Sequence, residues 1–421
     1  MLGAALAGGI CYTGPMSDHR YPCAAALSFG LEAVVRAELE AMGISGSQAE
    51  DRRVTFEATA AEIARANLRL RTADRVLIRL GEFRALDFGE LYEGIRSIPW
   101  RDIVSHGAAI TVHARSNRSR LISVPALQSV GKKAVVDALL HRAEGHHHGS
   151  GGGHHRSGPM HLEETGPHHD VEIAIQGDTV AVLLDTSGAG LHRRGYRTEA
   201  GEAPLRETLA AALVLLSRWE PPRPFADPLC GSGTIPIEAA MVAAQIAPGR
   251  TRSFAGEALS ILPSAAWSQE REAARSQERR GISVDIAASD KDPRMVDISA
   301  QNARRAGVSQ LVRVRRASME GFQSSAEYGC MVCNPPYGER VGERNEVSAL
   351  EQAMGRVLAD LPTWSLFALT ADTDFPRNFG SRPSRNRKLY NGNIRCYYYQ
   401  YFGPLPPHPS GSGFQPGRER S

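Results

Sequence analysis

The first half of the chain alternates short apolar runs with segments of helical periodicity. Apolar residues recur every three or four positions in the segments 31–42, 61–70, 89–97 and 124–140, which predicts helices with one buried face. Short apolar or alternating runs predict strands at 21–30, 54–58, 76–80, 109–114, 170–175 and 180–184. The pattern predicts α+β units over 21–70 and 71–185, after an extension, 1–20, that we expect to be disordered.

After a turn-rich basic linker, 186–203, strands and helices alternate, which predicts a parallel sheet with helical connections over 204–405. The predicted helices are 203–217, 235–247 and 294–306, and the strands begin at 225 and span 284–290, 311–317, 328–333 and 364–370. A hairpin over 387–402 turns at Asn391-Gly392. The charged stretch 250–280 is interpreted as an insertion that covers one side of this sheet, and the tail 406–421 as disordered.

Composition limits the class of protein. With 421 residues, of which 42% are apolar, the chain is long enough for two or three domains. No apolar run approaches the roughly 20 residues needed to span a membrane. The six cysteines are scattered, so we expect a reduced, cytoplasmic protein. Because the net charge is only +3, any basic surface must be local.

Two patterns suggest metal binding and are interpreted otherwise. Residues 141–169 contain nine of the fourteen histidines beside a Gly/Ser run, which we interpret as a flexible surface insertion, because ligands on a loose loop are not preorganised. Cys330 and Cys333 form a CxxC within a predicted strand, where residues three apart point to opposite faces. We therefore predict buried structural cysteines and no metal site.

A glycine-rich turn follows the first strand of the second half, at Asp227-Pro-Leu-Cys-Gly-Ser-Gly-Thr234. Gly231 and Gly233 allow the backbone to approach a ligand closely, and Ser232 and Thr234 lie near amides where a helix begins and an anionic group is favoured. The spacing matches neither the dinucleotide fingerprint nor a P-loop. Alone, this turn is weak evidence for a cofactor site.

Two further motifs end neighbouring strands. Asp290 ends the 284–290 strand, where a carboxylate beside a glycine turn can accept both hydroxyls of a ribose. The alternative is that Asp290, followed by Asp292 and Pro293, only caps the next helix. Asn334-Pro-Pro-Tyr337 ends the 328–333 strand and presents an amide, a proline carbonyl and an aromatic ring where a planar amine could bind.

Together these motifs resemble the cofactor turn, ribose-binding acid and catalytic motif of class I S-adenosylmethionine-dependent methyltransferases that act on exocyclic amines. The segments 191–197 and 203–207 and the first half resemble THUMP-domain RNA guanine-N2-methyltransferases, closest to bacterial 23S rRNA members. The resemblance covers about 22–404. It implies an α/β fold: a Rossmann-like domain with a mixed seven-stranded sheet, preceded by an α+β ferredoxin-like and THUMP region. It also implies S-adenosylmethionine as cofactor, RNA as partner, and a monomer.

The resemblance further implies individual roles. The Asn334 side-chain oxygen and the Pro335 carbonyl would each accept one N–H of the guanine amine, Pro336 completes the motif, and Tyr337 would stack on a flipped-out base. The implied cofactor contacts are Asp227, Cys230, Gly231, Ser232, Gly233, Thr234, Asp290 and Glu320. The candidate phosphate contacts are Arg115, Arg118, Arg120, Lys132, Lys133, Arg193 and Arg194.

Several alternatives remain at this point. A tRNA guanine would require the same chemistry as one in rRNA. The Asn-Pro-Pro-Tyr motif also occurs in DNA adenine-N6 and protein glutamine methyltransferases, although the first half of the chain argues against both. A catalytically idle RNA-binding assembly factor could keep the fold, but the intact glycine turn and Asn334 favour an enzyme.

Overall fold

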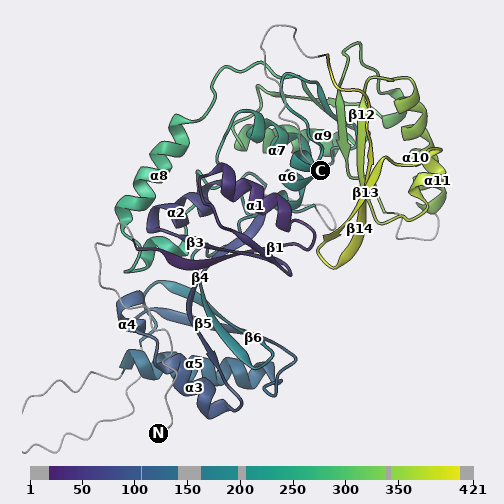
Figure 1. Cartoon of the computed structure of the whole chain (residues 1–421). Helices are drawn as coiled ribbons and strands as arrows, with labels where there is room; N and C mark the ends of the chain where they lie inside the picture. Colours follow the sequence, from purple (N-terminus) through teal and green to yellow (C-terminus); the bar gives the residue numbers. More distant parts are fainter. Residues whose placement is uncertain (1–18, 106, 141–162, 198–204, 338–342, 408–421) are drawn as a thin grey trace, which may run out of the picture. The chain divides into compact units, whose positions relative to one another are not determined.

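The computed structural model describes residues 19–105, 107–140, 163–197, 205–337 and 343–407 (Figure 1). The chain divides into two compact units. The first unit comprises residues up to 212 together with 241–282 and 389–391, and the second comprises 213–240, 283–388 and the chain from 392. None of the described helices combines the length and apolar character that a membrane span needs.

The sheet of the first unit runs in the order β2-β3-β1-β4-β7-β6-β5. Its neighbouring strands are antiparallel except β5 and β6, which are parallel. The strands are β1 (Tyr21–Leu27), β2 (Gln48–Glu50), β3 (Arg53–Ala58), β4 (Ala73–Arg84), β5 (Ala109–Asn117), β6 (His168–Gln176) and β7 (Thr179–Asp185).

Strand β4 joins the two halves of this sheet. It has 12 residues, whereas the alternation in the sequence predicted a strand only at 76–80. One edge pairs with β1, from Cys23 opposite Ile78 to Leu27 opposite Ala73, and the other edge pairs with β7. The expected boundary after residue 70 therefore precedes a strand that both halves share, and the two predicted α+β units form one continuous sheet.

The helices of the first unit confirm the predicted periodicity. Helix α2 begins with a capping box in which the Thr59 side chain accepts from the Glu62 amide and the Glu62 carboxylate accepts from the Thr59 amide. The helices are α1 (Glu32–Ala41), α2 (Ala60–Arg69), α3 (Phe88–Arg96), α4 (Trp100–Ile103), α5 (Val124–Leu140) and α8 (Ser264–Ser276), with a 3-10 turn η1 (Ala255–Ala258).

Helix α8 lies in the charged stretch that we expected to cover the sheet of the second domain. It packs instead against α2 in the first unit, where the Arg65 guanidinium donates two hydrogen bonds to the Glu270 carboxylate, at 3.1 and 2.7 Å. Glu270 is buried, and this paired contact satisfies its charge. The stretch 250–280 therefore belongs to the first unit. Hydrophobic periodicity alone did not identify α2 as the packing partner of α8.

The sheet of the second unit has the order β10-β9-β8-β11-β12-β14-β13. The strands from β10 to β12 are parallel, and β14 is antiparallel to β12, so the predicted mixed seven-stranded sheet is confirmed. The strands are β8 (Phe225–Asp227), β9 (Ile286–Asp290), β10 (Val312–Arg316), β11 (Cys330–Cys333), β12 (Ser365–Thr370), β13 (Arg385–Asn391) and β14 (Ile394–Tyr401).

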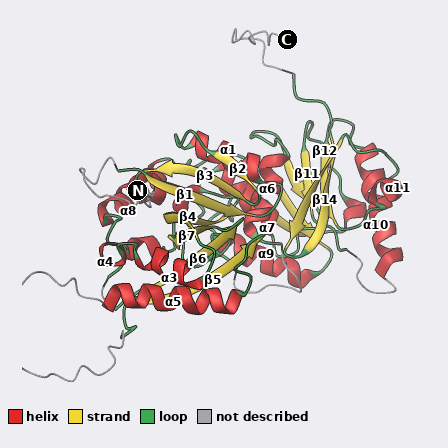
Figure 2. Cartoon of the chain, turned by 60° about the horizontal axis from the view of Figure 1, so that its bottom comes forward, coloured by secondary structure: helices red, strands yellow, loops and turns green. Residues whose placement is uncertain are grey.

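Helices lie on both faces of this sheet, with α10 and α11 on one face and α7 and α9 on the other (Figures 1 and 2). The next strand in the sequence after β8, which is β9, lies on one side of β8, and β11 lies on the other side of β8. The strand order therefore reverses between β8 and β11. The helices are α6 (Glu207–Leu216), α7 (Thr234–Ala243), α9 (Pro293–Arg305), α10 (Glu343–Ala359) and α11 (Phe375–Phe379), with a 3-10 turn η2 (Met319–Gly321).

Cys330 and Cys333 are buried in a strand as predicted, whereas the predicted flexible insertion 141–169 is wrong at its end, because His168 and His169 pair in the sheet. Cys330 and Cys333 are free, fully buried thiols in β11, and burial raises the pKa of both, that of Cys330 to about 12, so neither is a thiolate at neutral pH. Most of the His-rich insertion, 141–162, lies outside the described residues, whereas His168 and His169 belong to β6. No metal-binding cluster of His, Cys, Asp or Glu occurs in the described parts of the chain.

Candidate active site

Three neighbouring parallel strands of the second sheet end at the same edge. β8 ends at Asp227, β9 ends at Asp290, and β11 ends at Cys333, directly before Asn334. The register places Asp227 opposite Ala288 of β9, and Ala226 opposite Met331 of β11. In open α/β sheets, ligands bind outside the carboxyl ends of the strands where the strand order reverses. The fold therefore gathers the predicted motifs at the expected place.

The glycine turn after β8 has a backbone that only glycine adopts easily. Gly231 has φ +50° and Gly233 has φ +83°, both in the left-handed region. A Cβ on Gly233 would lie 2.3 Å from Ser299 Oγ on α9, so this glycine is also required for close packing. Cys230 is buried with its sulfur 4.0 Å from the same Ser299 oxygen. Its side chain supports the turn, and any cofactor contact from Cys230 would come from its backbone.

Asp290 is tied to the glycine turn. One carboxylate oxygen accepts from the Gly231 amide at 3.0 Å, and the other accepts from the Asp292 amide at 2.9 Å. Asp292, whose side chain accepts from the Arg294 amide, is the N-cap of α9. The alternative that Asp290 itself caps this helix is therefore wrong. Asp290 instead holds the turn beside the end of β9, with its remaining lone pairs available for a ligand hydroxyl.

Asp227 is a buried carboxylate at the centre of this edge. It is 1% exposed, and its described hydrogen bond comes from the Leu229 amide at 3.1 Å. Burial raises its pKa well above the usual value, and the negative charge of Asp290 raises it further. A cationic ligand group would supply the counter-charge that such a carboxylate lacks. The ammonium group of the methionine portion of S-adenosylmethionine fits this requirement.

Asn334 and Tyr337 form a hydrogen-bonded pair after β11. The Tyr337 hydroxyl donates to the Asn334 side-chain oxygen at 2.8 Å, and the Cys396 sulfur of β14 lies 3.5 Å from that hydroxyl. Pro335, which lies between Asn334 and Tyr337 in the sequence, is buried, and Cys396 is fully buried. The C-terminal hairpin thus supports the amide group that was predicted to hold the substrate. No pattern in the sequence linked Cys396 to this motif.

The other predicted site residues lie in different parts of the two units, and some of them already form hydrogen bonds within the protein. Glu320 is exposed in η2, after the end of β10, at the same edge of the sheet as Asp290. In the first unit, Arg115 is exposed but pairs with Glu172 at 2.6 Å, and Lys132 donates to the Ile110 carbonyl at 2.5 Å. The remaining candidates on the surface are Arg118, Arg120, Lys133 and Arg193.

Arg194 does not fit the phosphate-binding role predicted for it. It is only 3% exposed, and its guanidinium donates to the carbonyls of Leu191 and Arg71. A guanidinium that is buried among carbonyl groups stabilises the backbone around it and is not presented to RNA. The prediction was wrong because the sequence shows the charge of this segment but not which of its arginines points inward.

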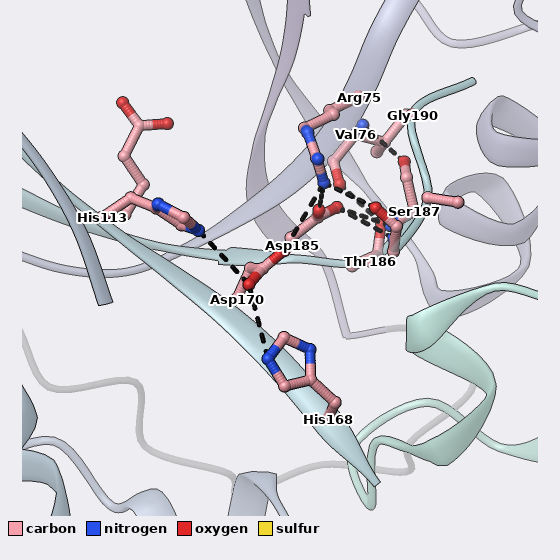
Figure 3. A network of polar contacts seen from close by, with 12 residues as sticks. Arg75, Val76, His113, His168, Asp170, Asp185, Thr186, Ser187 and Gly190 are labelled. Atoms are coloured by element: carbon pink, nitrogen blue, oxygen red, sulfur yellow. Dashed lines mark hydrogen bonds and ion pairs between the residues drawn. The ribbon is translucent and has the colours of Figure 1, made fainter. Parts of the chain in front are cut away.

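A second charged cluster lies in the first unit, between β4, β5, β6 and β7 (Figure 3). Arg75 contacts Asp185 and lies 3.8 Å from Asp170, while His113 Nε2 lies 3.3 Å from Asp170. Asp185 also accepts from the Ser187 amide at 2.7 Å. The cationic side chains of this cluster form ion pairs with its carboxylates. We therefore interpret the cluster as a set of ion pairs that links neighbouring strands.

The strand order, the glycine turn at the reversal point and the acidic end of the neighbouring strand define a Rossmann-like methyltransferase. Its cofactor is S-adenosylmethionine, and the buried Asp227 and the close-packed glycine turn fit that molecule. Comparison with known proteins agrees with this class. The RMKL-like methyltransferase domain family matches residues 194–400, and the RlmL ferredoxin-like domain matches residues 23–77.

Relatives match over almost the whole chain. The chain is 40% identical over 390 residues to "Putative RNA methyltransferase YpsC" of Bacillus subtilis, covering 92% of this chain and 97% of YpsC. A crystal structure of a predicted N6-adenine-specific DNA methylase from Listeria monocytogenes is 41% identical, with TM-score 0.84, covering 92% and 98% of the two chains. SMU.472, crystallised with SAH, is 40% identical, with TM-score 0.83, covering 92% and 99%. The chain belongs to this RMKL-like methyltransferase family.

Proposed function

We propose that the protein transfers a methyl group from S-adenosylmethionine to the exocyclic N2 amine of a guanine in structured RNA, with 23S rRNA as the favoured substrate. The observation that carries this proposal is the position of Asn334 directly after β11, at the same edge of the sheet where β8 leads into the glycine turn and β9 ends at Asp290. The ferredoxin-like match over residues 23–77 and the 40% identity to YpsC support an RNA substrate.

The chemistry follows from the groups around Asn334. A guanine amine is a poor nucleophile because its lone pair is conjugated into the ring. If the Asn334 oxygen and the Pro335 carbonyl each accept one N–H, the lone pair points toward the methyl group that the cofactor supplies. Bound S-adenosylmethionine would supply the methyl group from its sulfonium and leave as S-adenosylhomocysteine, and the methylated amine would release one proton to water. Orientation of this kind can contribute up to about 7–11 kcal/mol in the best-aligned cases.

The target base must leave its stack to reach such a position. A base inside folded RNA is not accessible to a motif at the edge of a sheet, and flipping it out costs a few kcal/mol. Stacking of the Tyr337 ring on the extruded base would offset part of that cost. Asp227 would hold the ammonium of the cofactor, Asp290 its ribose and Glu320 its adenine amine.

An adenine amine is the second candidate. The 41% identical structure from Listeria monocytogenes is named as a predicted N6-adenine-specific DNA methylase, and the Asn-Pro-Pro-Tyr motif suits any planar exocyclic amine. A tRNA guanine would use the same site in the same way. The N-terminal unit, with its ferredoxin-like half, favours RNA over DNA.

Mass spectrometric mapping of methylated bases in rRNA and tRNA from cells with and without this gene tests the proposal. We expect one N2-methylguanine to disappear from 23S rRNA in the deletion strain and to return when the purified protein acts on that RNA with S-adenosylmethionine. Loss of a methyladenine would favour the second candidate. Unchanged nucleosides in both RNAs, together with no transfer by the purified protein, would contradict an RNA methyltransferase.

Asp290→Asn is expected to weaken cofactor binding by about tenfold, because a neutral amide is a poorer acceptor for the ribose hydroxyls than a carboxylate. The substitution keeps the shape and one acceptor oxygen near the Gly231 amide. Calorimetric titration with S-adenosylmethionine measures the effect. An unchanged dissociation constant would remove Asp290 from the cofactor site.

Tyr337→Phe is expected to lower the methyl-transfer rate by about tenfold, the effect of losing one hydrogen bond of roughly 1.4 kcal/mol, while cofactor affinity stays unchanged. The variant keeps the aromatic ring and removes only the hydroxyl that donates to Asn334. Single-turnover rates at saturating cofactor and RNA measure the effect. Cys396→Ser, which keeps a donor at that position, serves as the matched control and should remain close to wild type. A wild-type rate for Tyr337→Phe would contradict a positioning role for the hydroxyl.

A further inference from the structure

The first half of the glycine turn is fixed to the end of strand β9. The Cys230 amide donates to the Ser289 carbonyl at 2.9 Å, and the Gly231 amide donates to the Asp290 carboxylate at 3.0 Å. Both bonds join the turn to the strand that carries the candidate ribose-binding acid. The turn therefore takes its position from β9 as well as from β8, the strand that it follows.

The second half of the turn is held by helix α9. The Asn302 side-chain nitrogen donates to the Ser232 carbonyl at 2.9 Å, although the two residues lie 70 positions apart in the sequence. One helical turn before Asn302, Ser299 lies so close to Gly233 that a Cβ on this glycine would be 2.3 Å from the Ser299 oxygen. Both Asn302 and Ser299 are fully buried. On this polar face of α9, Asn302 is the residue whose side chain bonds to the backbone of the turn.

A buried asparagine can also serve only to fasten its helix. The Asn302 oxygen accepts from the Arg305 guanidinium at 3.3 Å, a bond within α9 that ties the helix to no neighbour. The helix also packs through Ala303, which is 1% exposed. An apolar side chain at 302 would pack in the same place without the cost of burying an amide. The amide therefore contributes one specific contact beyond packing, which is its bond to the Ser232 carbonyl.

The bond from Asn302 sets the orientation of the peptide group between Ser232 and Gly233. At one end of this peptide, the Gly233 amide donates to the Cys230 carbonyl at 2.8 Å. At the other end, the Ser232 carbonyl points to the fully buried Asn302, so it is turned into the protein. Gly233 has φ +83°, and a glycine restricts the rotation of its peptide less than any other residue. Asn302 therefore supplies a constraint that the glycine backbone lacks.

This orientation leaves the donors of Ser232 for a ligand. The Ser232 amide has no hydrogen-bond acceptor among the residues that the structure describes. Ser232 is partly exposed, and its hydroxyl lies 3.2 Å from that of Thr234, where α7 begins and a negative group is favoured. A carbonyl turned outward at the same place would repel an anion. Free donors without an outward carbonyl are what a carboxylate requires.

We propose that Asn302 is a positioning residue for S-adenosylmethionine: it holds the Ser232 carbonyl toward α9, so that the Ser232 amide and hydroxyl bind the carboxylate of the cofactor. The inference rests on the place proposed for the methionine portion of the cofactor at the glycine turn, and it does not depend on which base is methylated. Asn302 acts through the turn and does not touch the cofactor. Its effect is therefore confined to ligands that carry the carboxylate.

Two ligands of the same site separate this role from a general effect on stability. S-adenosylhomocysteine and 5′-methylthioadenosine are both uncharged at sulfur, but only S-adenosylhomocysteine carries the amino-acid portion with its carboxylate. We expect Asn302→Ala to bind S-adenosylhomocysteine about tenfold more weakly, the effect of losing one hydrogen bond, and to bind 5′-methylthioadenosine as the wild type does. Titration calorimetry gives the first dissociation constant, and displacement of bound S-adenosylhomocysteine gives the second.

A second variant and a control complete the test. Asn302→Leu fills the space of the amide without a donor, so it should show the same difference between the two ligands even where the alanine variant is unstable. Asn378→Ala is the matched control: it removes another side-chain amide of the second unit, which donates to the buried Glu351 at 2.7 Å from a helix that follows β12. This control should bind both ligands as the wild type does.

The ratio of the two affinities decides the role of Asn302. An equal loss for S-adenosylhomocysteine and 5′-methylthioadenosine would mean that Asn302 supports only the fold, and wild-type affinity for both would mean that it has no role at the turn. Either result, or a matching loss in Asn378→Ala, would overturn the proposal. These measurements need no RNA. A wild type that binds S-adenosylmethionine but methylates no RNA would contradict the proposed function, while the affinity ratio would still decide this inference.

Discussion

Asn334→Ala is expected to lower the rate of methyl transfer by about a hundredfold or more, while cofactor affinity stays within a few-fold of wild type. The substitution removes the side-chain oxygen that would hold one N–H of the target amine, so the lone pair is no longer aimed at the methyl group. It leaves the glycine turn and Asp290 intact, because the described contact of the Asn334 oxygen is with Tyr337 and not with the turn.

Single-turnover methyl transfer at saturating cofactor and RNA measures this loss directly, because binding and product release do not limit such a rate. Asn345→Ala, at an exposed position of α10 in the same unit, is the matched control and should retain the wild-type rate. Calorimetric titration with S-adenosylmethionine checks that the cofactor site is preserved. Full activity of Asn334→Ala would remove Asn334 from the proposed mechanism.

The edge that carries the candidate site was predictable because parallel strands impose a strong local signal. Each of β8, β9 and β11 is an apolar run that ends at a polar residue or a glycine turn, and alternation with helices implies that the strands are parallel. Their carboxyl ends must then share one edge of the sheet, whatever the details of packing. Asp227, Asp290 and Asn334 could therefore be grouped before the structure was known.

The contacts that support the site were not predictable in this way. The bond from the Gly231 amide to Asp290 joins residues 59 positions apart, and the approach of Cys396 to Tyr337 also joins residues 59 positions apart. No rule of residue spacing in the sequence predicts either contact, because each contact depends on how separate elements pack. The same limit explains Arg194, whose charge is visible in the sequence but whose burial is set by tertiary contacts.

The hydrophobic periodicity also failed to predict the full length of β4, a strand that pairs with a neighbour on each side. β4 was predicted as a short strand because its second half, around Gly81, breaks the alternation, and the structure has a register shift there. The strand continues through this irregularity because β7 pairs with it on both sides of the shift. The charged stretch 250–280 was predicted to cover the second sheet, but it contains helix α8, which packs against α2 and pairs Glu270 with Arg65.

Asp227→Asn is expected to weaken the binding of S-adenosylmethionine by about ten- to a hundredfold, since a hydrogen bond between charged groups contributes roughly 1.5–3 kcal/mol. Among the described residues no cation contacts this buried carboxylate, and burial raises its pKa in the free enzyme. The ammonium of the cofactor would favour the ionised form and lower that pKa in the complex. Cofactor affinity should therefore rise as the pH increases through the raised pKa of the free enzyme, and binding should release a proton.

The same shift predicts how stability depends on pH. Because the pKa of Asp227 in the free folded protein lies above its unfolded value, its protonated form stabilises the fold at low pH, and that contribution is lost as pH rises through the folded pKa. Bound cofactor offsets the loss, so its stabilising effect should grow with pH. Titrations at a series of pH values that begins near the usual pKa of an aspartate and extends upward, in buffers of different ionisation enthalpy, measure the released proton. Asp227→Asn should abolish both the proton release and the pH dependence, and their persistence in that variant would assign them to another group.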